Sequence, residues 1–308
     1  MKHIFVVNPM SGQRKAVDFI KTELEKYKDK IDCQLYITKG IGDAEKYIND
    51  YLKSHNEKVR FYACGGDGTI NEAVNGTAPF PHASLAVCPC GSGNDFVKTF
   101  GSKEDFPDIG SLINGTEIPI DIMKVNNRYC VNVCNFGFDS YVAKKMNEIR
   151  SKPLIGGKNA YTTGVILGLV KAMKNNASVI ADGEKMNSGT LLLCTVANGR
   201  YVGGKYKCAP KAIVNDGLLE ICLVKPVSRI TFIRLVNAYA EGQHLEDSRF
   251  KKFVRYKRCK KVEIIADDKF NISIDGEIFT FPHTNIEIIP KGLSFVLPKK
   301  LLNCDSLM

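Results

Sequence analysis

The hydrophobic pattern changes its period at about residue 121, and the two sides of that point predict different folds. Before it, continuous apolar runs typical of buried strands alternate with stretches whose apolar residues recur at helical spacing. Strands alternating with helices predict an α/β domain over residues 1–121, built on a parallel sheet. The expected strands are 4–7, 34–37, 59–64 and 84–88, and the expected helices follow residue 12, begin at the N-cap Asp43, cover 70–76 and begin again near Phe96.

After residue 121, short strands joined by tight turns replace this pattern. Hairpins are predicted at 124–129 and at 177–186, the second around Asp182-Gly183. One amphipathic helix, capped by Ser228, interrupts the strands. We therefore expect an all-β sandwich domain over 122–298, with the tail 299–308 as a candidate to pack back on the first domain. The other expected strands are 191–196, 218–224, 261–266, 270–274, 286–289 and 293–297.

All four strands of the predicted α/β domain end in loops rich in Gly, Ser, Thr, Asn and Asp. These loops begin at Asn8, Thr38, Gly65 and Pro89. In an open parallel sheet the carboxyl ends of the strands lie on one edge, which is where ligands bind. Four such loops on one edge are harder to explain by packing than one would be, so the pattern predicts a binding site there.

The loop Gly65-Gly66-Asp67-Gly68-Thr69 is the most informative of the four. Glycines at a strand-to-helix turn let the backbone approach a phosphate, and the helix N-terminus supplies N–H donors. Because a lone carboxylate repels phosphate, Asp67 is best explained as the partner of a metal ion that bridges to a nucleotide. A tight turn that packs a helix onto a sheet would account for the glycines, but not for Asp67 or Thr69.

Four other segments have simpler explanations on spacing alone. Asp275-Gly276-Glu277 follows an alternating strand, where Asp-Gly is a common hairpin turn, and 215–218 is also turn-like. The basic run 251–261 is usually a solvated face, although in a protein acting on membranes it would be a candidate to contact anionic headgroups. The apolar stretch 160–169 is more often core than ligand pocket, but its small residues leave room for a lipid-lining role.

Composition narrows the partners without choosing among them. The chain has 308 residues and a net charge of +10, which implies an acidic partner such as nucleic acid, an anionic membrane surface or a polyphosphate. No recognition helix or aromatic stacking pattern supports nucleic acid. The 11 cysteines are scattered, which is typical of a reducing compartment, and Cys88-Pro89-Cys90 lacks the second pair of a zinc site. No signal peptide or run of about 18 apolar residues is present, so we expect a cytoplasmic protein.

Taken together, the motifs resemble a known family along nearly the whole chain. Asn8-Pro9-Met10-Ser11-Gly12, the run 65–72, Gly91-Ser92-Gly93-Asn94-Asp95-Phe96, Ala209-Pro210 with Asp216-Gly217, and Asp275-Gly276-Glu277 occur in the order found in soluble bacterial diacylglycerol kinases. That family is related to sphingosine kinases and, more distantly, to NAD kinase and phosphofructokinase. Ile70-Asn71-Glu72 and the Gly-Ser-Gly-Asn-Asp loop are similar to the lipid kinases rather than to NAD kinases.

The resemblance implies an ATP-binding α/β domain, a β-sandwich domain for the lipid substrate, and an active site in the cleft between them. Asp67 would reach a catalytic Mg²⁺ through water, and a second, structural Mg²⁺ would lie at Asp216 with backbone oxygens of Ile213 and Leu218. Asp275 and Glu277 would activate the substrate hydroxyl, and which of them accepts the proton is left open. ATP would be held by Asn8, Pro9, Met10, Ser11, Gly12, Thr38, Gly66, Asp67, Gly68, Thr69, Ile70, Asn71, Glu72 and Ser92, with Lys15 paired to Asp121 and with Asn94 and Asp95 in support.

The reaction implied is ATP- and Mg²⁺-dependent phosphorylation of a membrane lipid, with diacylglycerol converted to phosphatidic acid as the leading case. The protein would associate peripherally with the inner face of the membrane and would not need nucleic acid; a homodimer is left open. Two alternatives remain: a kinase for another lipid alcohol or a soluble nucleotide such as NAD, and a non-catalytic nucleotide- or lipid-binding regulator. The acids Asp67, Asp275 and Glu277 argue against the second, because a binding protein needs no proton acceptor.

Overall fold

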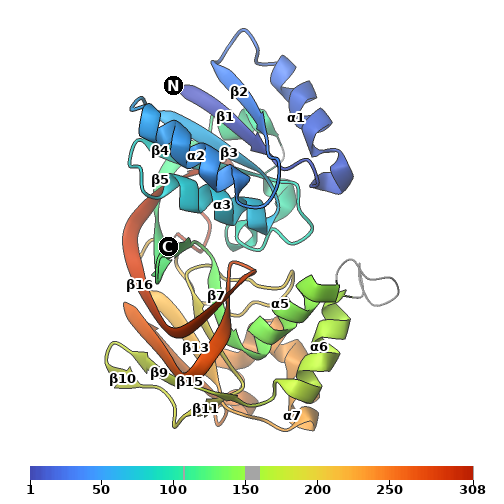
Figure 1. Ribbon diagram of the computed structural model, residues 1–308, viewed down its shortest axis with the longest axis vertical. Helices are drawn as coiled ribbons and strands as arrows, with labels where there is room; N and C mark the ends of the chain where they lie inside the picture. Colours follow the sequence, from blue (N-terminus) through green and yellow to red (C-terminus); the bar gives the residue numbers. More distant parts are fainter. Residues whose placement is uncertain (107, 150–159, 308) are drawn as a thin grey trace.

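The computed structural model describes residues 1–106, 108–149 and 160–307, and it has an N-terminal and a C-terminal part stacked along the long axis (Figure 1). In the N-terminal part, four parallel strands pair in the order β2-β1-β3-β4. β3 and β4 are buried along their whole length, because helices cover the sheet. The strands are β1 (Lys2–Val7), β2 (Cys33–Ile37), β3 (Val59–Gly65) and β4 (Ala83–Pro89), and the helices are α1 (Ala16–Glu25), α2 (Asp43–Ser54), α3 (Asp67–Thr77) and α4 (Ile109–Ile113).

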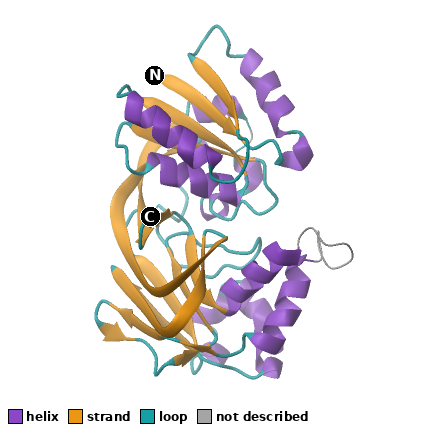
Figure 2. Ribbon diagram, viewed as in Figure 1, coloured by secondary structure: helices purple, strands orange, loops and turns teal. Residues whose placement is uncertain are grey.

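The C-terminal part is antiparallel, and Figure 2 shows its strands with helices packed to one side. Residues of the strand at 193–197 face two different cores. Cys194 and Val196 lie in the core between the strands, whereas Leu193 packs with the helices. The predicted fold class, an α/β domain followed by a β-sandwich, is confirmed. Its elements are β5 (Thr116–Val125), β6 (Arg128–Cys130), β7 (Val133–Gly137), α5 (Phe138–Ile149), α6 (Ala160–Lys171), β8 (Asn175–Asn176), β9 (Ser178–Ala181), β10 (Glu184–Lys185), β11 (Thr190–Leu191), β12 (Leu193–Ala197), β13 (Leu219–Val224), α7 (Arg229–Ala240), β14 (Val254–Cys259), β15 (Lys261–Ile274) and β16 (Glu277–Leu297).

The last two strands are longer than the sequence predicted. The segments 261–266 and 270–274 form one strand, β15, and 286–289 and 293–297 both lie in β16, which has 21 residues. Each strand shifts its pairing register where the apolar alternation is interrupted, between Ile265 and Phe270 and between Ile289 and Leu293. Those interruptions look like strand ends in the sequence, but the structure absorbs them as local irregularities.

β16 joins the two parts of the molecule, and it is the long curved strand on the left of Figure 1. Its first half pairs with β15, while Ser294 and Phe295 pair in parallel with β4 of the N-terminal sheet. Phe295 and Leu297 are fully buried in the N-terminal core. One strand therefore carries the chain from the turn at Asp275 directly into the N-terminal sheet, which holds the two parts in a defined relation.

Four helical segments differ from the sequence expectation. Gly42, in the left-handed conformation, is the N-cap of α2 in place of Asp43, whose carboxylate accepts the Lys39 N–H and the Tyr36 hydroxyl. Near Phe96 only a single 3₁₀ turn forms (Val97–Thr99). The C-terminal part contains α5 and α6 besides the predicted α7; α5 follows β7 directly, and α6 includes the whole apolar stretch 160–169. The predicted cap of α7 is confirmed, since Ser228 accepts the Thr231 N–H.

The chain's end lies at the junction of the two parts (Figure 1). Leu301 is buried in the N-terminal core, and the Ser306 carbonyl accepts the Val214 N–H from the C-terminal part. The tail therefore contacts both parts. The described cysteines form no disulfide.

Two buried histidines make the fold sensitive to acid. Burial lowers the pKa of both His3 and His244 to about 4, whereas an imidazole in an unfolded chain titrates near 6.5. Between these values only the unfolded chain takes up the proton, so stability is complete above about pH 6.5 and is lost as the pH falls toward 4. From pH 7.5 to 5 each histidine should take about 2 kcal/mol from the free energy of unfolding.

The raised pKa values of Asp67, Asp139 and Glu220 act in the opposite direction, so the contribution of a histidine is measured by urea denaturation as the difference between the wild type and its variant. His244→Phe should remove the part of this pH dependence that comes from His244, and His55→Gln, at an exposed position, serves as the control. An equal change in the free energy of unfolding with pH in the wild type and both variants would refute the assignment.

Candidate active site

Loops from different strands meet at the carboxyl edge of the N-terminal sheet, as the sequence predicted. The Asn8 side-chain amide lies 3.2 Å from the Thr69 hydroxyl, and the Gly12 N–H donates to the Cys90 carbonyl at 3.0 Å. The loops after β1, β3 and β4 therefore form one continuous surface. α3 begins at Asp67 in this surface, and its N-cap Gly66 has no side chain to bind the helix N–H groups. Those donors remain available to an anion.

Glycines bring the loops after β3 and β4 into backbone contact. A Cβ placed on Gly91 would lie 2.4 Å from the Cα of Gly66, and one on Gly93 would lie 2.4 Å from Oδ2 of Asp67. The Gly66 Cα belongs to the backbone, and the Asp67 carboxylate is held by the N–H groups of Asn94 and Asp95, so neither neighbour can move aside without loss. A side chain at either glycine would therefore push the two loops apart.

Asp67 is held by the second of these loops. Its two carboxylate oxygens accept the N–H groups of Asn94 at 2.8 Å and of Asp95 at 2.6 Å. Burial, followed by the neighbouring Asp95 carboxylate, raises the pKa of Asp67 to about 6, and Asp275 acts in the same direction. Asp95 is itself bound by the Lys98 ammonium at 2.9 Å. The site thus concentrates negative charge, which a cation would offset.

Asp275 is the meeting point of the two parts of the molecule. Its carboxylate accepts the backbone N–H groups of Val131, Asn132 and Val133 at 2.9 to 3.0 Å, and it also accepts the Cys130 thiol at 3.0 Å. The Asn71 amide of α3 donates to the same carboxylate at 3.2 Å. Five donors therefore occupy both oxygens.

The carboxylate of Glu277, two residues later, differs from that of Asp275 in its contacts. Its Oε1 lies 3.2 Å from the position that a Cβ on Gly68 would take, so it faces the first turn of α3. In the part of the chain that the structure describes, no hydrogen bond or ion pair holds its carboxylate. Burial, followed by the nearby Glu72 carboxylate, raises the pKa of Glu277, while the Arg128 guanidinium opposes that shift. Glu277 is therefore the available carboxylate of the pair.

Several residues predicted to hold ATP have other contacts in this structure. Ile70 is buried in the core, and the Thr38 N–H donates to the Val7 carbonyl where β2 ends beside β1. The Glu72 carboxylate accepts the N–H groups of Gly42 at 2.8 Å and Ala44 at 3.0 Å, so it caps α2. Of the predicted set, the residues at the loop surface are Asn8, Pro9, Met10, Ser11, Gly12, Gly66, Asp67, Gly68 and Ser92, while Thr69 is buried beneath them with its hydroxyl beside Asn8.

The predicted pair of Lys15 and Asp121 does not form. Lys15 is exposed and has no ion-pair partner among the described residues. Asp121 is fully buried, and its two oxygens accept the N–H groups of Gly217 and Lys291, each at 2.7 Å. Asp121 therefore ties β5 to the 214–217 turn and to β16, and Lys15 is not one of its partners.

The predicted second metal site does not fit a cation either. Asp216 forms an ion pair with the Arg258 guanidinium and also accepts the Leu218 N–H at 3.0 Å. A guanidinium already neutralises the only carboxylate of the expected set, which leaves Ile213 and Leu218 with backbone oxygens alone. We derive no chemistry from a metal at this turn.

Three contacts at the site were not expected from the sequence, and the Cys130 thiol on Asp275 is one of them. Arg128 forms two hydrogen bonds to the Glu45 carboxylate of α2, at 2.7 and 2.8 Å, and so joins the β5–β6 hairpin to the N-terminal part. The Gly204 N–H donates to both oxygens of Asp95, at 3.0 and 3.1 Å. Of the three donors, only Gly204 could have been anticipated from the sequence, because two successive glycines at 203–204 indicate a tight turn.

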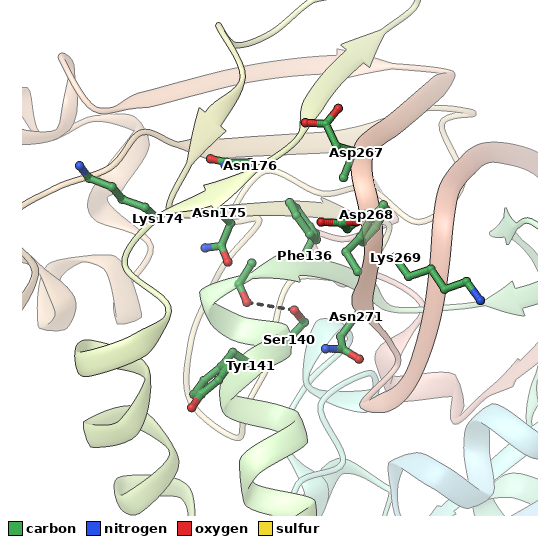
Figure 3. A pocket seen from close by; sticks show the side chains of 13 residues that line it. Phe136, Ser140, Tyr141, Lys174, Asn175, Asn176, Asp267, Asp268, Lys269 and Asn271 are labelled. Carbon is green, nitrogen blue, oxygen red and sulfur yellow. Dashed lines mark hydrogen bonds between the residues drawn. The ribbon is translucent and has the colours of Figure 1, made fainter.

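A separate cavity of about 340 Å³ lies in the C-terminal part, between the start of α5 and the irregular segment of β15. Figure 3 shows Phe136 surrounded by polar side chains, including Asn175, Asp267 and Asn271. The Ser140 hydroxyl donates to the Gly137 carbonyl at 2.9 Å, the dashed line in Figure 3. A lining this polar does not suit acyl chains, and we do not assign the cavity to them.

Within the described ranges, no three His, Cys, Asp or Glu side chains converge to hold a metal by themselves. Mg²⁺ is usually bound by one or two carboxylates together with substrate phosphates, and such a site needs no cluster of protein ligands. Asp67 fits that pattern. Among the residues that the structure describes, no helix combines the length and apolar character needed to cross a bilayer.

Comparison with known proteins covers both parts of the chain. Residues 2–125 match the family model of the diacylglycerol kinase catalytic domain, and residues 132–297 match the YegS C-terminal NAD kinase beta sandwich-like domain. The chain is 29% identical over 299 residues to the diacylglycerol kinase of Bacillus subtilis (strain 168), covering 96% of each protein. It is 32% identical over 253 residues to the "probable lipid kinase YegS-like" of Shewanella frigidimarina (strain NCIMB 400), covering 79% of this chain and 77% of that protein.

A solved structure supports the same architecture. The crystal structure of a diacylglycerol kinase from Bacillus anthracis str. Sterne matches with a TM-score of 0.70 and 23% identity, covering 98% of both chains. At this identity the match speaks for the fold alone.

Proposed function

We propose a phosphotransfer reaction for this chain, which belongs to the diacylglycerol kinase family of lipid kinases: transfer of the γ-phosphoryl group of ATP to the hydroxyl of a membrane lipid, with diacylglycerol as the leading acceptor. One observation carries the proposal. The acids of the C-terminal turn reach the first turns of α3, where Asn71 binds Asp275 and Gly68 faces Glu277. A phosphate bound at the N-terminus of α3 would lie beside a free carboxylate.

The nucleotide is assigned to the loops after β1, β3 and β4. Backbone N–H groups at the start of α3 would bind its phosphates, and the Gly66–Gly91 contact keeps the loop surface free of side chains there. Asp67 would hold Mg²⁺, and when bound this ion would offset the charge of the phosphate oxygens and of the Asp67–Asp95 pair. These residues orient the triphosphate, which is most of what an enzyme contributes to phosphoryl transfer.

Glu277 is assigned as the proton acceptor. The hydroxyl oxygen of the lipid forms a bond to the γ-phosphorus, the bond from that phosphorus to the bridging oxygen breaks, and the hydroxyl proton passes to the Glu277 carboxylate as ADP departs. Asp275 is poorly suited to this step, because five donors already occupy its oxygens. We assign Asp275 as a positioning residue that fixes the turn and so aims Glu277.

The acceptor is tested by offering both substrate classes. Purified protein and ATP are incubated with a membrane lipid extract, and the phosphorylated products are identified by mass spectrometry; a parallel reaction offers NAD. Phosphatidic acid as the main new product supports the proposal. Phosphorylation of NAD without lipid product, or no ATP-dependent product in either reaction, refutes it in favour of a nucleotide kinase or a non-catalytic regulator respectively.

The nucleotide assignment predicts a specific sensitivity at Gly91. In Gly91→Ala the new methyl group meets the Gly66 backbone, and separating the loops should cost about 1–3 kcal/mol of ATP binding, a roughly 10- to 100-fold rise in Kd. Gly40→Ala is the matched control, because a Cβ there meets nothing within 4 Å. Kd values measured by calorimetry should separate the two variants. Equal ATP affinity in both would show that the loop contact does not shape the nucleotide site.

A further inference from the structure

The outer side of the C-terminal helices exposes a group of large aliphatic residues. Ile166 and Val170 on α6 are 58% and 61% exposed, and Ile230 and Ile233 on α7 are 64% and 61% exposed. Spacings of four and three residues place each pair on one side of its helix. We call these four residues, together with the cations around them, the α6–α7 surface.

The two helices form one continuous surface and are held together at their ends. The Arg229 side chain, at the start of α7, donates through Nε to the Leu169 carbonyl of α6 at 2.6 Å. A groove of about 640 Å³ runs between them and is lined by Val170, Met173, Val227 and Ile230 among others. The opposite side of these helices supplies the packing, since Phe138 and Phe232 meet there with ring centroids 4.8 Å apart. The exposed aliphatic residues are therefore additional to the core.

The charged residues on α6, on α7 and in the segments that directly adjoin them are basic. Segments 160–181 and 225–240 contain no Asp or Glu. The cations there are exposed, and none of them forms an ion pair in the part of the chain that the structure describes. They are Lys171, Lys174, Lys225, Arg229 and Arg234.

The basic run 251–261, a candidate headgroup contact if the protein acts on membranes, is different. Lys257 pairs with Glu184, Arg258 with Asp216 and Glu220, and Lys261 with Glu263. Three of its seven cations are thus paired within the protein. It also lacks neighbouring exposed aliphatic residues of the kind found on α6 and α7.

We propose that the α6–α7 surface docks on an anionic phospholipid bilayer. Exposed aliphatic residues ringed by such cations have the composition of an interfacial membrane contact: the aliphatic side chains enter the boundary of the acyl region while Lys and Arg contact headgroup phosphates. The charge decides the occupant, because a second copy of this chain would bring the same cations against these. The inference rests on the proposed function, since a lipid kinase must collect its acceptor from a bilayer.

Docking is tested without relying on catalysis. The chain contains no tryptophan, so Ile230→Trp introduces a single reporter. Ile41→Trp is the matched control, because Ile41 is 99% exposed in the N-terminal part. With phosphatidylglycerol vesicles and no nucleotide, we expect the tryptophan emission of Ile230→Trp to shift to the blue and to be quenched by brominated acyl chains, and the emission of Ile41→Trp to stay unchanged. An unshifted spectrum for Ile230→Trp, or equal shifts in both variants, overturns the proposal.

Vesicle flotation separates the two candidate surfaces. Ile230→Ser with Ile233→Ser, and separately Lys171→Glu with Arg234→Glu, should each weaken binding to phosphatidylglycerol vesicles at least about 10-fold. Lys251→Glu with Lys252→Glu should change it less than about 3-fold, and phosphatidylcholine vesicles should bind none of the proteins well. Loss of binding only in the 251/252 variant overturns the proposal, as does a wild-type dimer in sedimentation equilibrium that Ile230→Ser with Ile233→Ser dissociates.

The same variants keep this inference distinct from the catalytic proposal. Phosphorylation of a short-chain diacylglycerol dissolved as monomers should be unchanged in Ile230→Ser with Ile233→Ser, because no membrane is involved. If the wild type phosphorylates no lipid yet binds anionic vesicles through this surface, the catalytic proposal fails while docking stands. If turnover of vesicle-borne and dissolved acceptor falls equally in the variant, the surface acts on catalysis and the docking proposal fails.

Discussion

Glu277→Gln is expected to lower kcat by about 10²- to 10⁴-fold, the usual contribution of a general base, while leaving the Kd for ATP and the thermal stability unchanged. The substitution preserves the size of the side chain and removes only its ability to take the hydroxyl proton. Because no described group is bound to the Glu277 carboxylate, no hydrogen bond in the fold is lost. Steady-state kinetics with diacylglycerol micelles, beside calorimetric titration of ATP, measures both effects.

The control for this variant is its neighbour in space. Glu72→Gln keeps an oxygen that can accept an N–H group of α2 and lies outside the proton path, so it should lower kcat far less. A Glu277→Gln enzyme with near-wild-type kcat would remove Glu277 from the proton transfer and return the question to Asp275.

Asp275→Asn is expected to reduce the free energy of unfolding by about 2–4 kcal/mol as well as abolishing turnover. The carboxylate accepts backbone N–H groups from three successive residues, 131–133. An asparagine side chain offers one oxygen, and its NH₂ group would face donors, so at least one buried N–H would lose its partner. Urea denaturation of the variant gives the loss directly.

A second Asp-Gly turn provides the matched control. Asp182 also adopts a positive φ, 48° against 49° for Asp275, and its carboxylate accepts the N–H groups of Lys260 and Lys261. It is exposed, so water can replace the lost hydrogen bonds in Asp182→Asn, and a loss below about 1 kcal/mol is expected. Equal losses at the two turns would mean that Asp275 is an ordinary turn residue and does not join the two parts.

The pair of variants at 275 and 277 separates two roles that the motif alone cannot distinguish. Loss of activity with stability retained marks the proton acceptor, and loss of both marks the positioning residue. The pKa of Glu277 is raised by burial and by Glu72, which makes its carboxylate a better base than a fully solvated one. The contrasting environments, rather than the spacing, support the assignment.

Local patterns predicted the N-terminal part well. Continuous apolar runs became β1, β3 and β4, and the Gly-rich loops after them converged because parallel strands place their carboxyl ends on one edge. The fold class of the C-terminal part followed from its short strands and turns, with Asp182-Gly183 forming the expected hairpin between β9 and β10.

Long-range contacts could not be predicted in the same way. Nothing near Asp121 in the sequence indicates that its oxygens bind the backbone of Gly217 and Lys291, nor that Arg258 reaches Asp216. The continuity of β16 was hidden because a proline and a glycine, at 290 and 292, look like a strand end. The helix α5 was missed because it follows β7 directly. For Asp121 and Asp216 the deciding partner lies far away in the chain.

The transfer of ³²P from γ-labelled ATP to diacylglycerol in mixed micelles, by the wild-type chain and by Glu277→Gln side by side, tests most directly whether the two parts of the molecule form one catalytic site. The account predicts labelled phosphatidic acid from the wild type and at least about 100-fold less from the variant. Unlabelled lipid with the wild type, or equal labelling by both proteins, would contradict it.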